Sequence, residues 1–182
     1  MAGYYQFPVV AMKRYYHKEY KKYVYEIFLG GQYATKEENV IISTLLGSCV
    51  SACLVDFRSK VIGMNHFILP GDMRRQGILT SPRYGMYAME SLIESMVKLG
   101  ARRKRIEARV FGGGSIVNSR GRSVQKNNID FIKAYLGMEG IPIMFEDLGG
   151  DYGRKIYFFS DTFEIHQKKI ERVLMDKPKT RS

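Results

Sequence analysis

The chain has 182 residues, of which 45% are hydrophobic and 26% are charged, with 18 glycines and 5 prolines. This composition supports a packed core and excludes a disordered or collagen-like chain. No apolar run reaches the roughly 18–20 residues that cross a bilayer, and residues 1–16 do not have the pattern of a secretory signal. We therefore expect a globular protein of about one domain that does not insert into a membrane.

The formal net charge of +11 is concentrated at the two ends of the chain. Residues 1–24 and residues 165–182 each carry a net charge of +4, which leaves +3 for the body between them. Basic ends can contact nucleic acid, anionic lipid or an acidic partner, but charged termini are also commonly solvated and mobile. Tyrosines among basic residues can stack on bases, yet no nucleic-acid-binding signature is present, so we do not expect nucleic acid as a partner.

The two cysteines, Cys49 and Cys53, are expected to be free thiols. Four residues along a strand would separate them by roughly 13 Å, whereas a disulfide needs Cα atoms within about 7 Å. Unbridged thiols fit a reducing compartment, so we expect the protein in the cytoplasm. Two cysteines with no histidine at ligand spacing do not predict a zinc site.

The first half of the chain predicts strands. Residues 1–24 show no sustained period, and we interpret them as a basic, tyrosine-rich extension. From residue 25 onward the pattern changes, and the β-branched and apolar runs at residues 40–46, 46–56 and 61–70 predict strands. The last two runs are apolar on both faces, which is typical of a hairpin inside a covered sheet.

The second half predicts helices between strands. The clearest helix should begin at Ser81, which can cap it, continue through Pro82 and stop at Gly100. The later elements are a strand at residues 105–110, a helix at 128–138, a strand at 141–145 and a hairpin of residues 155–159 and 163–167. This interleaving predicts one mixed α/β domain over residues 25–167, followed by a basic tail at residues 168–182.

A thiol and an imidazole are expected to meet in the first predicted hairpin. If its turn is centred between Phe57 and Arg58, Cys49 lies directly opposite His66, with Cβ atoms roughly 4.5–5.5 Å apart. A slip of one residue would remove this pairing, because it moves every side chain to the other face. Such a pair is what an activated cysteine needs, but a free cysteine is also often a small buried apolar residue, and that alternative stays open.

Residues on either side of Cys49 suit a catalytic thiol. Gly47 and Ser48 can form a tight turn, and the backbone N–H groups of Ser48 and Cys49 would then hold an oxyanion. The hydroxyls of Ser43 and Thr44 lie just upstream and could orient the imidazole. The pair could rest either as thiol and imidazole or as thiolate and imidazolium.

Two other features are expected to be structural. The glycine run at residues 112–114 lacks the Lys-Ser/Thr of triphosphate loops and the spacing of dinucleotide folds. We expect these glycines to let the backbone turn close to the active cleft. Cys53 lies between Ala52 and Leu54 and is expected in the core.

The segment TLLGSCVSACLVD followed by GMNHFILP resembles the signature of CheD, the chemoreceptor glutamine deamidase family of bacterial chemotaxis. The resemblance continues in family order through RYGMYAMESLI, ARVFGGGSI, NIDFIKAYLGMEGIPI and EDLGGDYGRKIYF, and covers residues 25–167. It implies an α/β/α layered sandwich with a mixed sheet and a cysteine-hydrolase site like that of the cytotoxic necrotising factor toxins.

The resemblance also implies an activity, namely deamidation of selected glutamines on methyl-accepting chemotaxis receptors to glutamate and ammonia. It implies Cys49 as the nucleophile, His66 as the base, and either Ser43 or Thr44 as the third residue. This thioester mechanism requires no metal or organic cofactor. A CheC-like phosphatase is a further implied partner, and the alternative function is a binding module with little turnover.

Overall fold

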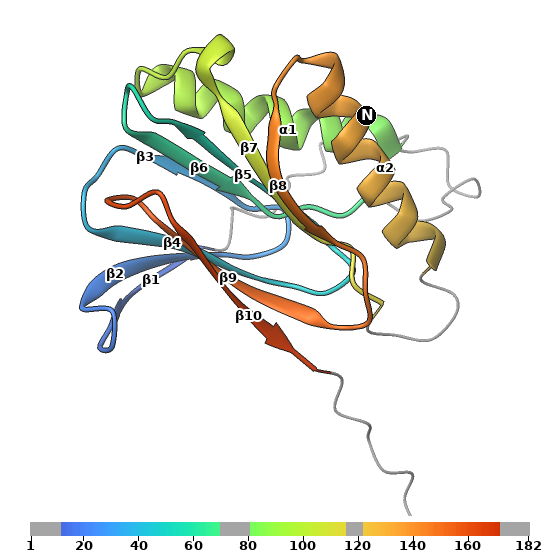
Figure 1. Cartoon of the computed structure of the whole chain (residues 1–182), viewed down its shortest axis with the longest axis horizontal. Coiled ribbons are helices and arrows are strands. Elements are labelled where there is room, and N and C mark those ends of the chain that lie inside the picture. The colour runs from blue at the N-terminus through green and yellow to red at the C-terminus, as the bar shows by residue number, and fades with distance from the viewer. Residues whose placement is uncertain (1–11, 70–80, 116–121, 172–182) are drawn as a thin grey trace, which may run out of the picture.

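The structure is a computed structural model that describes residues 12–69, 81–115 and 122–171. These residues form ten strands and two α-helices, and six of the strands precede the first helix (Figure 1). In chain order the elements are β1 (Met12–His17), β2 (Lys22–Ile27), β3 (Gln32–Thr35), β4 (Val40–Leu46), β5 (Val50–Asp56), β6 (Val61–Asn65), α1 (Ser81–Lys98), a 3-10 turn (Arg103–Arg105), β7 (Glu107–Gly112), α2 (Arg122–Met138), β8 (Ile143–Leu148), β9 (Gly153–Phe159) and β10 (Ile165–Ile170).

The strands form two mixed five-stranded sheets. The first sheet has the order β1-β2-β4-β9-β10 and the second has the order β3-β6-β5-β7-β8. Strands β2 and β4 are parallel, as are β7 and β8, and the other neighbours are antiparallel. A shared apolar core lies between the sheets, with Ile42, Ile156 and Phe158 from the first sheet against Ile62 and Met64 from the second.

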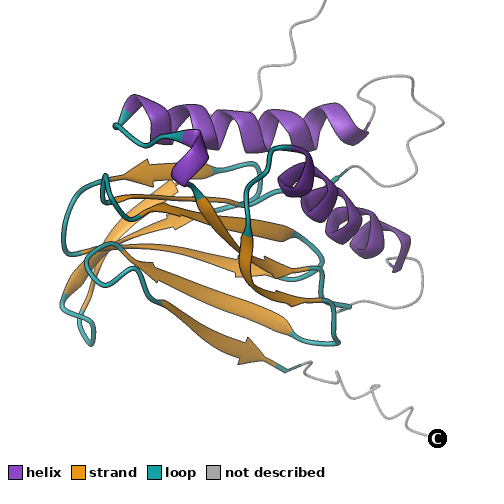
Figure 2. Ribbon diagram, turned by 45° about the horizontal axis from the view of Figure 1, so that its top comes forward, coloured by secondary structure: helices purple, strands orange, loops and turns teal. Residues whose placement is uncertain are grey.

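Both described helices cover the outer face of the second sheet, as Figure 2 shows. Helix α1 packs on β3 and β6, and α2 packs on β5. The predicted single α/β domain with mixed sheets is confirmed, but the expected α/β/α layering becomes α/β/β over the residues described. The reason is the connectivity, because α1 and α2 each link strands of the same sheet, and right-handed crossovers place both helices on one face.

Helix α1 follows the sequence prediction more closely than α2 does. It begins at Ser81, and Gly100 beyond its end has φ +107°, the left-handed conformation that favours glycine. Helix α2 begins at Arg122 and not at the predicted residue 128, and its buried face includes the polar side chains of Gln125 and Asn128. These polar residues interrupt the apolar pattern on which the prediction depended.

The first sheet begins at Met12, before the domain boundary predicted at residue 25. Strands β1 and β2 form an antiparallel pair, and β2 pairs in parallel with β4. On the outer face of this sheet, Tyr15 packs against an apolar cluster of Val24, Ile41 and Phe159. Tyr15 is partly buried and packs as an apolar residue, which a simple alternation of apolar and polar residues does not predict.

The β5–β6 hairpin has a four-residue turn, so that Asp56 pairs with Val61. The predicted turn centre between Phe57 and Arg58 is therefore wrong, and the pairing differs by two residues. The Asp56 carboxylate causes the longer turn by accepting hydrogen bonds from the backbone N–H groups of Arg58 (3.1 Å) and Ser59 (3.3 Å). A shift of two residues, unlike a shift of one, keeps each side chain on its expected face.

None of the helices that the structure describes is both long and apolar enough to cross a membrane.

Candidate functional site

Thr44 and His66 form a buried hydrogen-bonded pair between the two sheets. Thr44 Oγ1 lies 2.8 Å from His66 Nδ1 and 2.8 Å from the backbone carbonyl oxygen of Ile27. The single hydroxyl proton goes to the Ile27 carbonyl, so the hydroxyl oxygen accepts a hydrogen bond from Nδ1–H of the imidazole. This arrangement fixes the tautomer of neutral His66, with its proton on Nδ1 and its lone pair on Nε2.

Cys49 lies on the same face of the second sheet as His66. Val50 and Phe67 exchange two backbone hydrogen bonds of 3.0 Å, and Cys49 and His66 are the residues immediately before them. In an antiparallel pair this makes Cys49 and His66 diagonal neighbours, with Cα atoms roughly 7–8 Å apart. The direct opposition expected from the turn is wrong, but the shared face is kept. His66 Nε2 is buried and has no hydrogen-bond partner among the described residues.

Ser43 does not join this arrangement. It pairs with Tyr157 on the outer face of the first sheet, whereas Thr44 pairs with Ile156, which belongs to the core between the sheets. Adjacent residues of a strand point to opposite faces. Of the two hydroxyls that the sequence left open, the one that reaches His66 is therefore that of Thr44.

Burial keeps both titratable groups of the site neutral. It lowers the pKa of His66 to about 4. Burial also raises the pKa of the Cys49 thiol, and its own backbone N–H and the Ser48 side chain oppose this rise without cancelling it. The two directions together favour thiol and imidazole at neutral pH over thiolate and imidazolium.

The Gly47–Cys49 loop carries the chain from the first sheet to the second, and hydrogen bonds to its backbone carbonyls hold it in place. Each of its three carbonyl oxygens accepts one hydrogen bond, from Gly114 N to Gly47 (2.8 Å), from Asn128 Nδ2 to Ser48 (3.0 Å) and from Gly113 N to Cys49 (2.8 Å). A trans peptide directs its N–H opposite to its C=O. The N–H groups of Ser48 and Cys49 therefore point away from the glycine run and α2, as an oxyanion site formed by them would need.

The glycine run makes a close approach to this loop. Gly112 has φ +115°, and a Cβ atom there would lie 2.1 Å from the carbonyl oxygen of Cys49. Gly113 has φ +66° and donates the hydrogen bond to that same oxygen. The expectation that these glycines let the backbone pass close to the site is confirmed.

Asn128 is a site residue that the sequence analysis did not identify. Its amide nitrogen donates to the Ser48 carbonyl (3.0 Å), and its amide oxygen accepts from the backbone N–H of Leu69 (2.7 Å). Asn128 thereby links the segment that follows His66 to the segment that precedes Cys49. The available signal was a polar residue four positions before Ile132, on the buried face of a helix.

Cys53, the second cysteine, lies in the core. Cys53 is fully buried, as predicted, and burial raises its pKa to about 12. Both cysteines are free thiols. Within residues 12–69, 81–115 and 122–171, no group of three or more His, Cys, Asp or Glu side chains could hold a metal ion.

The fold and site define a class of protein, a two-sheet α/β domain with a free thiol near a buried, neutral histidine that a threonine orients. A family model described as CheD chemotactic sensory transduction matches residues 68–169. The chain belongs to this CheD family. The matched range begins just after His66, so the arrangement of Thr44, Cys49 and His66 rests on the geometry described above.

Several relatives carry the name probable chemoreceptor glutamine deamidase CheD. The protein from Laribacter hongkongensis is 47% identical over 148 residues, covering 80% of this chain and 72% of the relative. The one from Shewanella oneidensis is 43% identical over 173 residues, covering 92% of this chain and 82% of the relative. Among solved structures, the Bacillus licheniformis hypothetical protein YfiH has a TM-score of 0.43 at 12% identity, over 63% of this chain and 49% of that chain.

We predict that Gly112→Ala is far more destabilising than Gly100→Ala. Both glycines have similar positive φ angles, but a Cβ at Gly100 meets nothing within 4 Å, whereas one at Gly112 collides with the Cys49 carbonyl. Urea denaturation should show a free energy of unfolding at least about 2 kcal/mol lower for Gly112→Ala than for Gly100→Ala. Equal losses of unfolding free energy in the two variants would mean that the Gly47–Cys49 loop can move to accommodate the added Cβ atom.

We also predict that alkylation of Cys49 by iodoacetamide accelerates with pH. Because the resting thiol is protonated, the rate should rise about tenfold per pH unit from pH 6 towards pH 9. Mass spectrometry of tryptic peptides separates this reaction from that of Cys53, which should stay unlabelled in the folded protein. A rate that is level between pH 5 and pH 8 would instead indicate a preformed thiolate and imidazolium.

Proposed function

We propose that this protein deamidates selected glutamine side chains of methyl-accepting chemotaxis receptors, releasing glutamate and ammonia. The relatives described above carry the name of this activity. The observation that carries the proposal is the tautomer of His66, whose Nε2 lone pair is left free on the face that bears Cys49. A base in this state can take the proton of a neighbouring thiol.

The first half of the proposed reaction forms a thioester. His66 Nε2 takes the proton of Cys49 Sγ, and the thiolate attacks the side-chain carbonyl carbon of the receptor glutamine. The oxyanion that results accepts hydrogen bonds from the backbone N–H groups of Ser48 and Cys49. The imidazolium then gives its Nε2 proton to the leaving nitrogen, and ammonia departs as the carbon–nitrogen bond breaks.

The second half returns the site to its starting state. Nε2 of the now neutral His66 takes a proton from water, and the hydroxide oxygen attacks the thioester carbon. The carbon–sulfur bond breaks, the Cys49 sulfur regains the proton, and the receptor side chain leaves as glutamate. Thr44 acts as a positioning residue throughout, since its hydroxyl oxygen holds Nδ1–H and keeps Nε2 directed at the reacting atoms.

Location and partners follow from the same proposal. We place the protein in the cytoplasm, where free thiols such as Cys49 and Cys53 stay reduced. The partner that the reaction requires is the receptor. A CheC-like phosphatase is a second proposed partner, and its support is the family resemblance of the sequence.

The test of the activity is intact-peptide mass spectrometry of a receptor cytoplasmic fragment incubated with the wild type and with Cys49→Ala. We expect the mass gain of an amide-to-carboxylate conversion with the wild type and a rate at least about a thousandfold lower with the variant. Deamidation by Cys49→Ala would remove the nucleophile assignment. No conversion by either protein on several receptors would favour the binding-module function instead.

Substitutions at Thr44 and at Ser43 can test whether Thr44 alone positions His66. Thr44→Val should lower kcat about 10-fold to 100-fold with KM unchanged, because the valine cannot accept from Nδ1–H of His66. Thr44→Ser should restore most of the rate, and Ser43→Ala, on the other face of the strand, should match the wild type. A Ser43→Ala variant as slow as Thr44→Val would overturn the assignment.

A further inference from the structure

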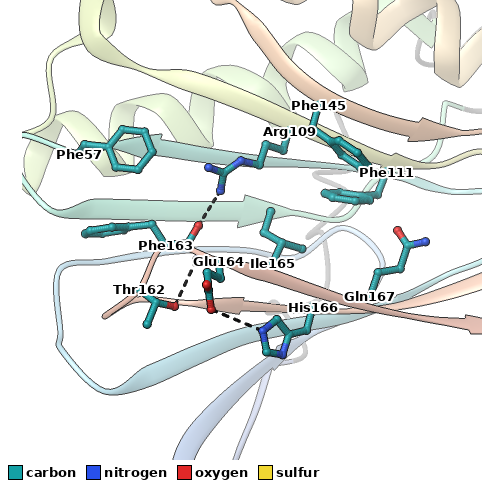
Figure 3. Close-up of a pocket in the computed structure, with 10 residues that line it drawn as sticks. All are labelled: Phe57, Arg109, Phe111, Phe145, Thr162, Phe163, Glu164, Ile165, His166 and Gln167. Carbon is teal, nitrogen blue, oxygen red and sulfur yellow. Dashed lines mark hydrogen bonds and ion pairs between the residues drawn. The ribbon is translucent and has the colours of Figure 1, made fainter.

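A cavity distinct from the Cys49 and His66 site lies between the two sheets. Its volume is about 580 Å³, within the range of small-molecule sites. Figure 3 shows its lining, which comes from β7 and β8 of the second sheet, from the β9–β10 hairpin of the first, and from the β5–β6 turn. Its walls include Phe57, Arg109, Phe111, Phe145, Phe163 and Ile165, and none of Thr44, Cys49 and His66.

Two aromatic pairs form the apolar walls. Phe57 and Phe163 meet edge to face with ring centroids 5.4 Å apart, and Phe111 and Phe145 lie 5.7 Å apart. In Figure 3 the side chain of Arg109 lies between the two pairs. Phe57 remains 43% exposed and Phe145 53% exposed, so the cavity offers aromatic surface that the protein itself does not cover.

Arg109 brings a positive charge into this apolar setting. Its Nη1 donates to the backbone carbonyl of Phe163 (2.6 Å), and among the described residues no carboxylate forms an ion pair with it. A guanidinium has five N–H donors in a planar fork that fits a carboxylate. The carboxylate among the lining residues belongs to Glu164, whose side chain is 66% exposed and lies 3.6 Å from His166 Nε2, so it faces solvent and does not pair with Arg109.

The hairpin wall is held in an unusual backbone conformation. Phe163 has φ +59°, which is uncommon for a bulky residue. Its N–H donates to the carbonyl of Phe159 (3.0 Å), and its own carbonyl accepts from Arg109. Backbone strain of this kind persists where surrounding contacts hold it and is concentrated at ligand sites. Here it places the Phe163 ring against Phe57 and the carbonyl on the guanidinium.

We propose that this cavity binds a small amphiphilic carboxylate. The acid group pairs with the N–H donors of Arg109 that Phe163 leaves free, and an aryl or alkyl body packs between the two phenylalanine pairs. Charge complementarity sets the class of ligand, because a cation inside an aromatic wall favours an anion with an apolar body over a neutral or a fully polar molecule.

The test is isothermal titration calorimetry of the full chain with 4-phenylbutanoate and with its neutral amide, 4-phenylbutanamide. We expect the acid to bind with a Kd of about 1 mM or tighter, and the amide to bind at least about tenfold more weakly. This comparison uses the wild-type protein and does not depend on whether a variant folds. Equal binding of acid and amide, or no binding of the acid up to about 10 mM, would overturn the proposal.

Two neighbouring positions on β8 supply matched variants. Phe145→Ala removes a wall of the cavity, whereas Met144→Ala removes a similarly exposed side chain that does not line it. We expect Phe145→Ala to weaken binding of 4-phenylbutanoate at least about fivefold and Met144→Ala to leave it unchanged. Arg109→Gln should remove the preference for acid over amide. Equal weakening by both β8 variants would locate the binding elsewhere.

Discussion

The Gly47–Cys49 loop is the constraint on which the site depends, because it is where the chain leaves one sheet and enters the other. All three of its carbonyls are fixed by groups from the glycine run and from Asn128. A loop held only at its ends could adopt several backbone conformations, and the Cys49 side chain would then have no fixed direction. With every carbonyl bound, the peptide planes are set, and the N–H groups and the thiol take the directions that remain.

A threonine in place of a carboxylate beside the histidine changes the electrostatics of the pair. A carboxylate would stabilise an imidazolium and raise the pKa of His66, whereas the Thr44 hydroxyl supplies orientation without charge. Burial then dominates, and the imidazole stays neutral. The neutral imidazole keeps its Nε2 lone pair, which is the state that the proposed reaction requires of its base.

Features that depend on local chemistry could be predicted from the sequence, and features that depend on distant contacts could not. The start of α1 and the glycine at its end follow from capping rules, and the Cys49–His66 face follows from strand alternation. The hairpin register did not follow from local rules, because the Asp56 carboxylate lengthens the turn and also binds Arg105 of the distant 3-10 turn before β7. The start of α2 was missed because Gln125 and Asn128 are polar residues on its buried face, where Asn128 binds Ser48 and Leu69.

The sequence also could not show whether Ser43 or Thr44 faces His66. Both are buried hydroxyls on one strand, and composition cannot tell which face of β4 turns toward the second sheet. The phenylalanine-lined cavity was also beyond prediction, since Phe57 and Phe163 are separated by most of the chain and meet only when the two sheets pack.

The protonated state of Cys49 has a consequence for the lifetime of the protein in an oxidising cell. Peroxide attacks thiolates, and the first product, a sulfenic acid, can proceed to forms that no thiol reductant reverses. Because burial raises the pKa of Cys49 and keeps its sulfur as a thiol at neutral pH, the residue offers peroxide little of the reactive thiolate. The same burial that makes the histidine a weak base therefore also protects the sulfur from oxidative loss.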